Sequence, residues 1–147
     1  MESFEALNEV MVSLFREINE VEERSIITQE FGDITNNDMH VIDAIGIGEP
    51  KNMSAIAREL SVTMGTLTIA MNSLVKKGYV IRQRGKADRR VVYISLSEKG
   101  TKAYHRHKDF HEQMVKSAVK ELTEEELKAL IKALRSLRSW MKSFEEH

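Results

Sequence analysis

Residues 53–96 read MSAIARELSVTMGTLTIAMNSLVKKGYVIRQRGKADRRVVYISL, and this stretch decides the fold. Apolar residues at helical spacing predict a short helix, a turn and a longer helix whose N-cap is Thr63. Two lysines followed by Gly78 are typical of a helix C-terminus. The remaining residues alternate around a turn at 85–88, which predicts a β-hairpin with strands at 79–84 and 90–96.

The charge of the chain is distributed unevenly. Residues 51–92 contain nine basic and two acidic residues, so this stretch carries +7, whereas the whole chain of 147 residues carries −1. The other residues therefore sum to −8. A basic module within an acidic frame is expected of a protein that reads nucleic acid from an acidic scaffold.

The composition excludes several classes of protein. Cysteine is absent, which excludes disulfides, thiol chemistry and Cys-ligated zinc. No apolar run reaches about 18 residues, so we expect no membrane partner, and we expect a cytoplasmic protein. No nucleophile motif, HExxH motif or phosphate loop is present, so the sequence predicts that the protein is not an enzyme.

The segments before and after the central stretch are predicted to be helical. Apolar residues separated by gaps of three and four predict a first helix over 2–26 with an acidic outer face. Thr35 followed three residues later by an acid resembles the capped start of a second helix, and Ser54 is expected to begin the third. Ser97 is expected to begin a helix that extends to about 121, and Thr123 resembles the capping-box start of the last helix.

The first and last helices each carry a heptad stripe of large apolar residues. Burying one Leu or Phe is worth roughly 1.5–3 kcal/mol, so such stripes are unfavourable in water. They could pack within the chain or against a second copy, and we favour a homodimer because the central stretch has core residues of its own. The predicted dimerisation residues are Phe4, Leu7, Met11, Leu14, Leu130, Leu134, Leu137 and Met141.

Residues 53–100, and most clearly DRRVVYISLSEKG at 88–100, resemble the MarR family of bacterial winged-helix transcription regulators. The resemblance extends over nearly the full order of helices. It implies a mainly α fold with a small β-hairpin wing, a winged helix-turn-helix within a MarR-like dimer. It also implies a single domain over 1–147, with a DNA-binding lobe at 35–96 and dimerisation helices at 1–30 and 97–147.

Three segments further resemble the repressors of fatty-acid biosynthesis genes within this family. They are MHVIDAIG at 39–46, VTMGTLTIAMNSLVKKGYV at 62–80 and HRHKDFHEQMV at 105–115. This resemblance implies a dimer that binds a palindromic double-stranded DNA operator. It also implies acyl-acyl carrier protein as a co-repressing partner, with the acyl chain in an apolar slot between helices.

The outer face of the longer central helix offers small polar and apolar groups. Its hydroxyl and amide groups can hydrogen-bond bases or phosphates, and its methyl groups can lie against thymine, although such residues also occur on ordinary helix surfaces. A serine at a helix start can bind a phosphate. Together with the hairpin tip, the expected DNA-binding residues are Ser54, Thr63, Met64, Gly65, Thr66, Thr68, Ile69, Asn72, Arg84, Lys86, Asp88, Arg89 and Arg90.

The hairpin tip is strongly basic. In the family pattern, an arginine near the tip enters the minor groove, where narrow A·T-rich DNA concentrates negative potential, and Arg89 is our candidate for this role. The family role of Asp88 is to hold an arginine in place, and Arg90 is the nearest candidate. The alternative for these residues is a solvated turn. The alternative for the whole module is a winged helix that binds only protein, and such a module would be expected to lack this concentrated charge.

His107 and His111 lie four residues apart and therefore share one helix face. Together with His40 and the glutamates near the end of the first helix, they could hold Zn²⁺, as in a zinc-responsive MarR-type repressor. Histidines on an apolar stripe are more often core or interface residues that hydrogen-bond a neighbour. We therefore expect no cofactor, and the zinc-responsive repressor remains the alternative function.

Overall fold

The helix α4 (Met64–Lys77) has the two ends that the sequence predicts. The Thr63 side chain accepts a hydrogen bond from the backbone N–H of Thr66, and Gly78 adopts the left-handed conformation with φ 88°. In this computed structural model, which describes residues 2–26 and 30–145, the inner face of α4 is fully buried. Leu67, Met71 and Leu74 are each 1% exposed or less, which confirms the predicted core stripe.

The helix α3 (Met53–Leu60) begins one residue earlier than predicted. Its N-cap is Asn52, whose side-chain oxygen accepts a hydrogen bond from the Ala55 N–H at 2.8 Å, so Ser54 lies within the first turn. Asparagine caps helices at least as well as serine, which accounts for the difference. Ser61 ends the helix with φ 56° and starts the turn that leads into α4.

Three strands form an antiparallel sheet in the order β1-β3-β2. The strands are β1 (Lys51–Asn52), β2 (Val80–Arg84) and β3 (Val92–Leu96), and the hairpin pairs Arg84 with Val92. The hairpin is confirmed, but the connecting loop covers 85–91 and both strands are shorter at one end than predicted. The strand β1 was not predicted, because a two-residue strand has too few residues to show alternation.

The helix α2 (Asn36–Ile45) starts with the predicted capping box. Thr35 Oγ1 accepts from the Asp38 N–H at 3.1 Å, and the Asp38 carboxylate accepts from the Thr35 N–H at 3.0 Å. The core of the winged lobe, which we define as α2–α4 with β1–β3, also includes Ile42, Ile56 and Ile94, each at 0% exposure. The helix α1 (Glu2–Ile26) has the predicted bounds, and only its C-terminal end joins this core, through Ile26.

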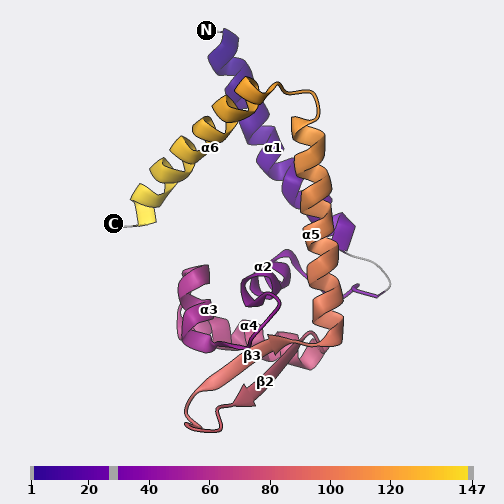
Figure 1. Ribbon diagram of the computed structural model, residues 1–147, viewed down its shortest axis with the longest axis vertical. Coiled ribbons are helices and arrows are strands. Elements are labelled where there is room, and N and C mark those ends of the chain that lie inside the picture. The colour runs from indigo at the N-terminus through magenta and orange to yellow at the C-terminus, as the bar shows by residue number, and fades with distance from the viewer. Residues whose placement is uncertain (1, 27–29, 146–147) are drawn as a thin grey trace. The chain divides into compact units, whose positions relative to one another are not determined.

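The Leu-Ser-x-x-Gly motif connects the end of α4 to the start of α5 (Glu98–Val119). The Ser97 hydroxyl donates to the carbonyl of Gly78 at 2.5 Å and accepts from the N–H of Gly100 at 3.1 Å. A Cβ at Gly100 would lie 2.0 Å from the Tyr79 carbonyl oxygen, so only glycine fits this close approach. The start of α5 is therefore fixed to the winged lobe, which Figure 1 shows below it.

The chain forms two compact units, Met1–Phe110 and His111–His147, and the boundary falls within α5. The second unit contains α6 (Glu124–Glu145), which starts with the predicted capping box: the Thr123 N–H donates to Glu126, and Thr123 Oγ1 accepts from the Glu126 N–H. None of residues 111–144 is buried, so this unit has no core of its own among them. Within the part of the chain that is described, every helix is too short or too polar to span a membrane.

Candidate nucleic-acid interface

The outer face of α4 presents the groups that the sequence predicts. Met64, Gly65, Thr66, Thr68, Ile69 and Asn72 are all exposed, and Ile69 is 75% exposed. The Thr68 hydroxyl donates to the Met64 carbonyl at 2.7 Å, so its oxygen faces the surroundings as an acceptor. The Thr63 hydroxyl donates to Thr66 Oγ1 at 3.0 Å, which leaves the Thr66 hydroxyl hydrogen available to a phosphate or a base.

Ser54 lies beside the start of α4. Together with Arg58, Val62 and Met64, it lines a shallow depression formed by α3 and the turn into α4. The structure therefore brings Ser54 to the same edge as Met64, at the N-terminal end of the longer helix. Backbone N–H groups and the positive end of the helix dipole favour anionic ligands at such an end.

Asn72 contacts the hairpin. Its side-chain oxygen accepts a hydrogen bond from Arg82 Nη1 at 2.6 Å, and both residues are exposed. Arg82 was not among the predicted site residues, although it contributes to the basic stretch. The alternation along β2 was the available signal, because it places Arg82 on the same strand face as the buried Val80. This contact fixes Asn72 relative to the hairpin.

The wing, defined as β2, β3 and the loop 85–91, is held in shape by its own contacts. The Asp88 carboxylate accepts hydrogen bonds from Arg90 Nε at 3.1 Å, Arg90 Nη2 at 3.2 Å and the Arg90 N–H at 3.0 Å. The Arg90 side chain, followed by its backbone N–H, lowers the pKa of Asp88. The structure confirms the predicted pairing of Asp88 with Arg90, while Arg89 is exposed beside this pair.

Glycine is required at the base of the wing loop. A Cβ at Gly85 would lie 2.6 Å from the Asp88 carbonyl oxygen and 3.1 Å from the Tyr93 ring. The Gly85 N–H donates to the Val91 carbonyl at 2.8 Å, which closes the loop. Arg84, Lys86, Arg89 and Arg90 are all exposed around this closed loop, as a basic tip requires.

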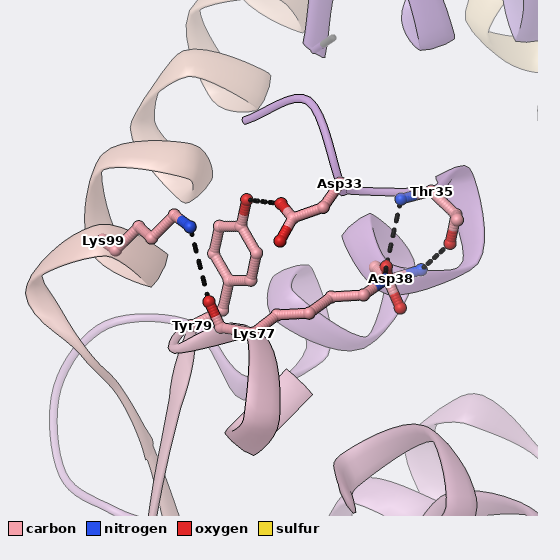
Figure 2. A network of polar contacts seen from close by, with 6 residues as sticks. All are labelled: Asp33, Thr35, Asp38, Lys77, Tyr79 and Lys99. Atoms are coloured by element: carbon pink, nitrogen blue, oxygen red, sulfur yellow. Dashed lines mark hydrogen bonds and ion pairs between the residues drawn. The ribbon is translucent and has the colours of Figure 1, made fainter. Parts of the chain in front are cut away.

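A network of polar contacts joins the C-terminal end of α4 to its neighbours (Figure 2). Lys77 Nζ lies 2.8 Å from the Asp38 carboxylate. The backbone carbonyl of Lys77 accepts a hydrogen bond from Lys99 Nζ at 3.4 Å. The fully buried Tyr79 donates its hydroxyl hydrogen to Asp33 at 2.6 Å, and Lys99 Nζ lies 4.5 Å from the Tyr79 ring centroid. Burial, and then the bond to Asp33, raise the pKa of Tyr79.

Besides Arg82 and Arg90, two more of the basic residues counted in the sequence make internal contacts. Lys77 pairs with Asp38, whose side chain is 8% exposed, and Lys51 Nζ donates to the Ala44 carbonyl at 2.8 Å. These cations hold the lobe together and satisfy a helix end. Charge counting could not separate them from the wing residues, because it ignores where each side chain points.

The predicted histidines do not all come together. Glu22 and His107 are both buried, and ligand atoms of these two residues lie within 4.8 Å of one another. His111 follows His107 by one turn of α5, whereas His40 is exposed on α2 and does not belong to the group of candidate ligands found among the described residues. Glu22 is one of the two glutamates near the end of the first helix, Glu22 and Glu23, that the sequence offers as further ligands.

The predicted dimerisation residues remain largely in contact with solvent. On α1, Phe4 is 67% and Leu7 is 60% exposed, while on α6 Leu134 is 55% and Met141 is 52% exposed. Leu14 and Leu130 are also exposed, and Met11 and Leu137 are half-buried. Exposed stripes of large apolar side chains are typical of surfaces that bind another molecule.

Comparisons with known proteins agree with this geometry. The MarR family model matches residues 32–91, which include α2–α4 and most of the wing. The HTH-type transcriptional regulator YhjH of Bacillus subtilis is 30% identical over 117 residues, a match that covers 77% of this chain and 67% of YhjH. The HTH-type regulator PchR of the same organism is 29% identical, and there the match covers 64% of the relative, just under two thirds of its length.

Solved structures give longer matches. The crystal structure of Streptococcus pneumoniae FabT in complex with DNA is similar with a TM-score of 0.87 and 35% identity, covering 96% of this chain and 99% of that chain. The S. aureus MepR–DNA complex is similar with a TM-score of 0.70 and 20% identity, covering 92% and 97%, which supports the fold alone. The winged helix-turn-helix fold expected from the sequence is therefore confirmed.

Proposed function

Because this chain belongs to the MarR family of transcription regulators, we propose that it is a homodimeric repressor that binds a palindromic DNA operator. At the coarser level, it is a DNA-binding transcription regulator and not an enzyme. The finer proposal includes control of fatty-acid biosynthesis genes with acyl-acyl carrier protein as the co-repressor. Its support comes from the exposed residues of α4 and the wing, and from the similarity to FabT over nearly the full chain.

One observation carries the DNA-binding surface. The exposed face of α4 and the basic wing are joined by the Arg82–Asn72 hydrogen bond, so that side chains able to read bases lie next to side chains able to bind phosphates. A helix fits the major groove, and a basic tip fits the adjacent minor groove. Since each phosphate contact releases a counterion, affinity should fall steeply with salt.

The exposed apolar residues of α1 and α6 support the homodimer. A second copy would remove Phe4, Leu7, Leu134 and Met141 from water, which is favourable by roughly 1.5–3 kcal/mol for each large side chain. A twofold dimer would also present two copies of α4, the proposed recognition helix, about one DNA turn apart, as a palindromic operator requires. Residues 1–30 and 97–147 would then form the dimerisation part of a single domain.

Gel-shift titration tests the operator. Promoter fragments of fatty-acid biosynthesis genes should be bound more tightly than scrambled duplexes of the same length, and the preference should persist as salt is raised. Equal binding to promoter and scrambled DNA would contradict operator recognition. If neither the promoter nor the scrambled duplex is bound, the whole proposal is contradicted, because the basic wing alone should supply non-specific affinity.

Acyl-acyl carrier protein is tested in the same titration. We expect the acylated carrier to tighten operator binding, whereas the unacylated carrier serves as the matched control. Reciprocity then requires that operator DNA tighten binding of the acylated carrier to the regulator by the same factor. If both forms of the carrier leave the titration unchanged, the repressor has a different effector.

The pair Glu22 and His107 favours a second candidate, a zinc-responsive repressor. Both side chains are buried and close enough to share one ion, and His111 is the next histidine along α5. Imidazole and carboxylate groups are common zinc ligands. Calorimetry with Zn²⁺ should then give stoichiometric binding that weakens in Glu22→Gln, a change that keeps the size of the side chain. A silent titration of the unsubstituted protein would remove this candidate.

A further inference from the structure

The contact between Arg82 and Asn72 joins the two parts of the interface. Arg82 Nη1 donates to Asn72 Oδ1 at 2.6 Å, although β2 and α4 are separate elements and both side chains are exposed. Val80, two residues earlier on the same strand, is 4% exposed, so this face of β2 points toward the lobe. Arg82 therefore reaches the exposed edge of α4 from the side.

The contact fixes which end of the Asn72 amide can read DNA. A guanidinium group has only donors, so it must face the amide oxygen rather than the amide nitrogen. The nitrogen, with its two hydrogens, then remains available to a base. We propose that Arg82 is a specificity-determining residue that presents Asn72 to the operator as a hydrogen-bond donor, an inference that rests on the proposed DNA-binding function.

This orientation changes the base that Asn72 would select. An asparagine with both amide groups available pairs bidentately with adenine, accepting from N6 and donating to N7. With Arg82 donating to the oxygen at 2.6 Å, the pair presents mainly donors to the DNA, which suit acceptors on the base and oppose the N6 donor of adenine. Guanine offers two acceptors, O6 and N7, and thymine offers O4, whereas adenine offers N7 beside the N6 donor that opposes Arg82, so Asn72 favours guanine or thymine over adenine.

The neighbouring side chains favour the same readout. Ile69 lies one turn before Asn72 on α4 and is 75% exposed, so its methyl groups can contact a thymine methyl. Thr68 has its hydroxyl hydrogen directed to the Met64 carbonyl and offers only its oxygen and methyl group. Asn72 and Arg82 therefore add donors to a face on which the side chains of Thr68 and Ile69 offer none.

Selection from a pool of random duplexes followed by sequencing tests the assignment. The wild-type protein should enrich guanine or thymine at the position whose base distribution changes in Asn72→Ala. In Arg82→Met, which keeps the alkyl stem and removes the donors, adenine should gain about tenfold at that position relative to the wild type. Arg82→Lys should retain the wild-type preference, because an ammonium group is also a pure donor.

The control separates base readout from affinity. Arg89→Ala removes a basic side chain from the wing and should lower the yield of bound duplex without changing the preference at the Asn72 position. If the wild type enriches a sequence and Arg82→Met keeps the same base preference, the proposed role of Arg82 is overturned, but operator recognition is not. Failure of the wild type to enrich any sequence overturns the proposed operator recognition, and this assignment with it.

Discussion

The winged lobe and the terminal helices bury their apolar residues to very different extents. In the lobe, the inner face of α4 is closed by the chain itself, and Met71 and Leu74 are 0% exposed. On α1 and α6 the stripes are equally regular in sequence, yet Phe4 is 67% and Leu134 is 55% exposed. The lobe therefore buries its apolar residues within the chain, whereas the stripes on α1 and α6 stay exposed, as the proposed homodimer would require.

The largest expected effect comes from placing a charge on the α6 face. Leu134→Glu removes an apolar contact from each copy and adds a charge that is costly to bury, so the dimer should weaken by about 3 kcal/mol or more, at least a hundredfold. Sedimentation velocity over a concentration series measures the change. Operator binding should fall in parallel, because a single recognition helix covers only one half-site.

Ser136→Glu is the matched control for that experiment. It adds the same charge to an exposed position about half a turn away on α6 and should leave the dimer intact. If Leu134→Glu remains as dimeric as this control, the apolar face of α6 is not an interface. The comparison between lobe and terminal helices would then need another explanation.

A cavity in the lobe should have the next largest effect, but on stability. Leu74→Ala empties a site that is 0% exposed and should lower the free energy of unfolding by about 2–5 kcal/mol. Thermal or urea unfolding measures the loss. Leu130→Ala on α6, where the side chain is 38% exposed in the single chain, should change the unfolding of the dimer in a concentration-dependent way instead. Equal, concentration-independent losses would contradict the distinction.

The outer surface of the lobe should affect affinity and not stability. Arg89→Ala removes an exposed cation from the wing tip while the Asp88–Arg90 pair keeps the loop in shape. We expect operator binding to weaken by at least about 1 kcal/mol with an unchanged melting temperature, as for the loss of a charge-assisted contact. Gel shift and thermal unfolding of the same preparation measure both quantities, and unchanged binding would contradict the minor-groove role of Arg89.

Sequence patterns predicted the parts of the lobe that depend on local physics. Helical periodicity gave the bounds of α1, and the capping box at Thr35 was visible because both partners lie within one turn. The start of α3 was misplaced by one residue because Asn52 and Ser54 are both good capping residues. Local signals of this kind are sufficient when the partners are near in sequence.

Contacts between distant residues could not be predicted in the same way. The bond from Arg82 to Asn72 joins two polar residues on different elements, and nothing in the period of either element requires it. Tyr79 was expected to begin a strand, but it lies before β2 with its ring buried and its hydroxyl on Asp33, 46 residues earlier. Such pairings depend on how elements pack, which composition and spacing do not determine.

The smallest expected effect tests whether the polar network contributes to the stability of the lobe. Tyr79→Phe removes the hydroxyl that donates to Asp33 and should lower the free energy of unfolding by about 1 kcal/mol at neutral pH. The hydrogen bond from Tyr79 is the main cause that lowers the pKa of Asp33 in the folded state. The stabilisation is therefore present above the unfolded pKa of about 3.9 and is lost as the pH falls through the lower folded value.

Urea unfolding of the wild type and of Tyr79→Phe at a series of pH values measures this dependence. The difference between the two proteins should be constant from about pH 5 to 7 and should shrink below about pH 4, where Asp33 becomes protonated. Tyr93→Phe, an exposed tyrosine on β3, is the matched control and should show no such pH dependence. A difference that persists unchanged into acid would mean that the Tyr79 hydroxyl stabilises the lobe independently of the charge on Asp33, and that the carboxylate form of Asp33 is not needed for this contribution.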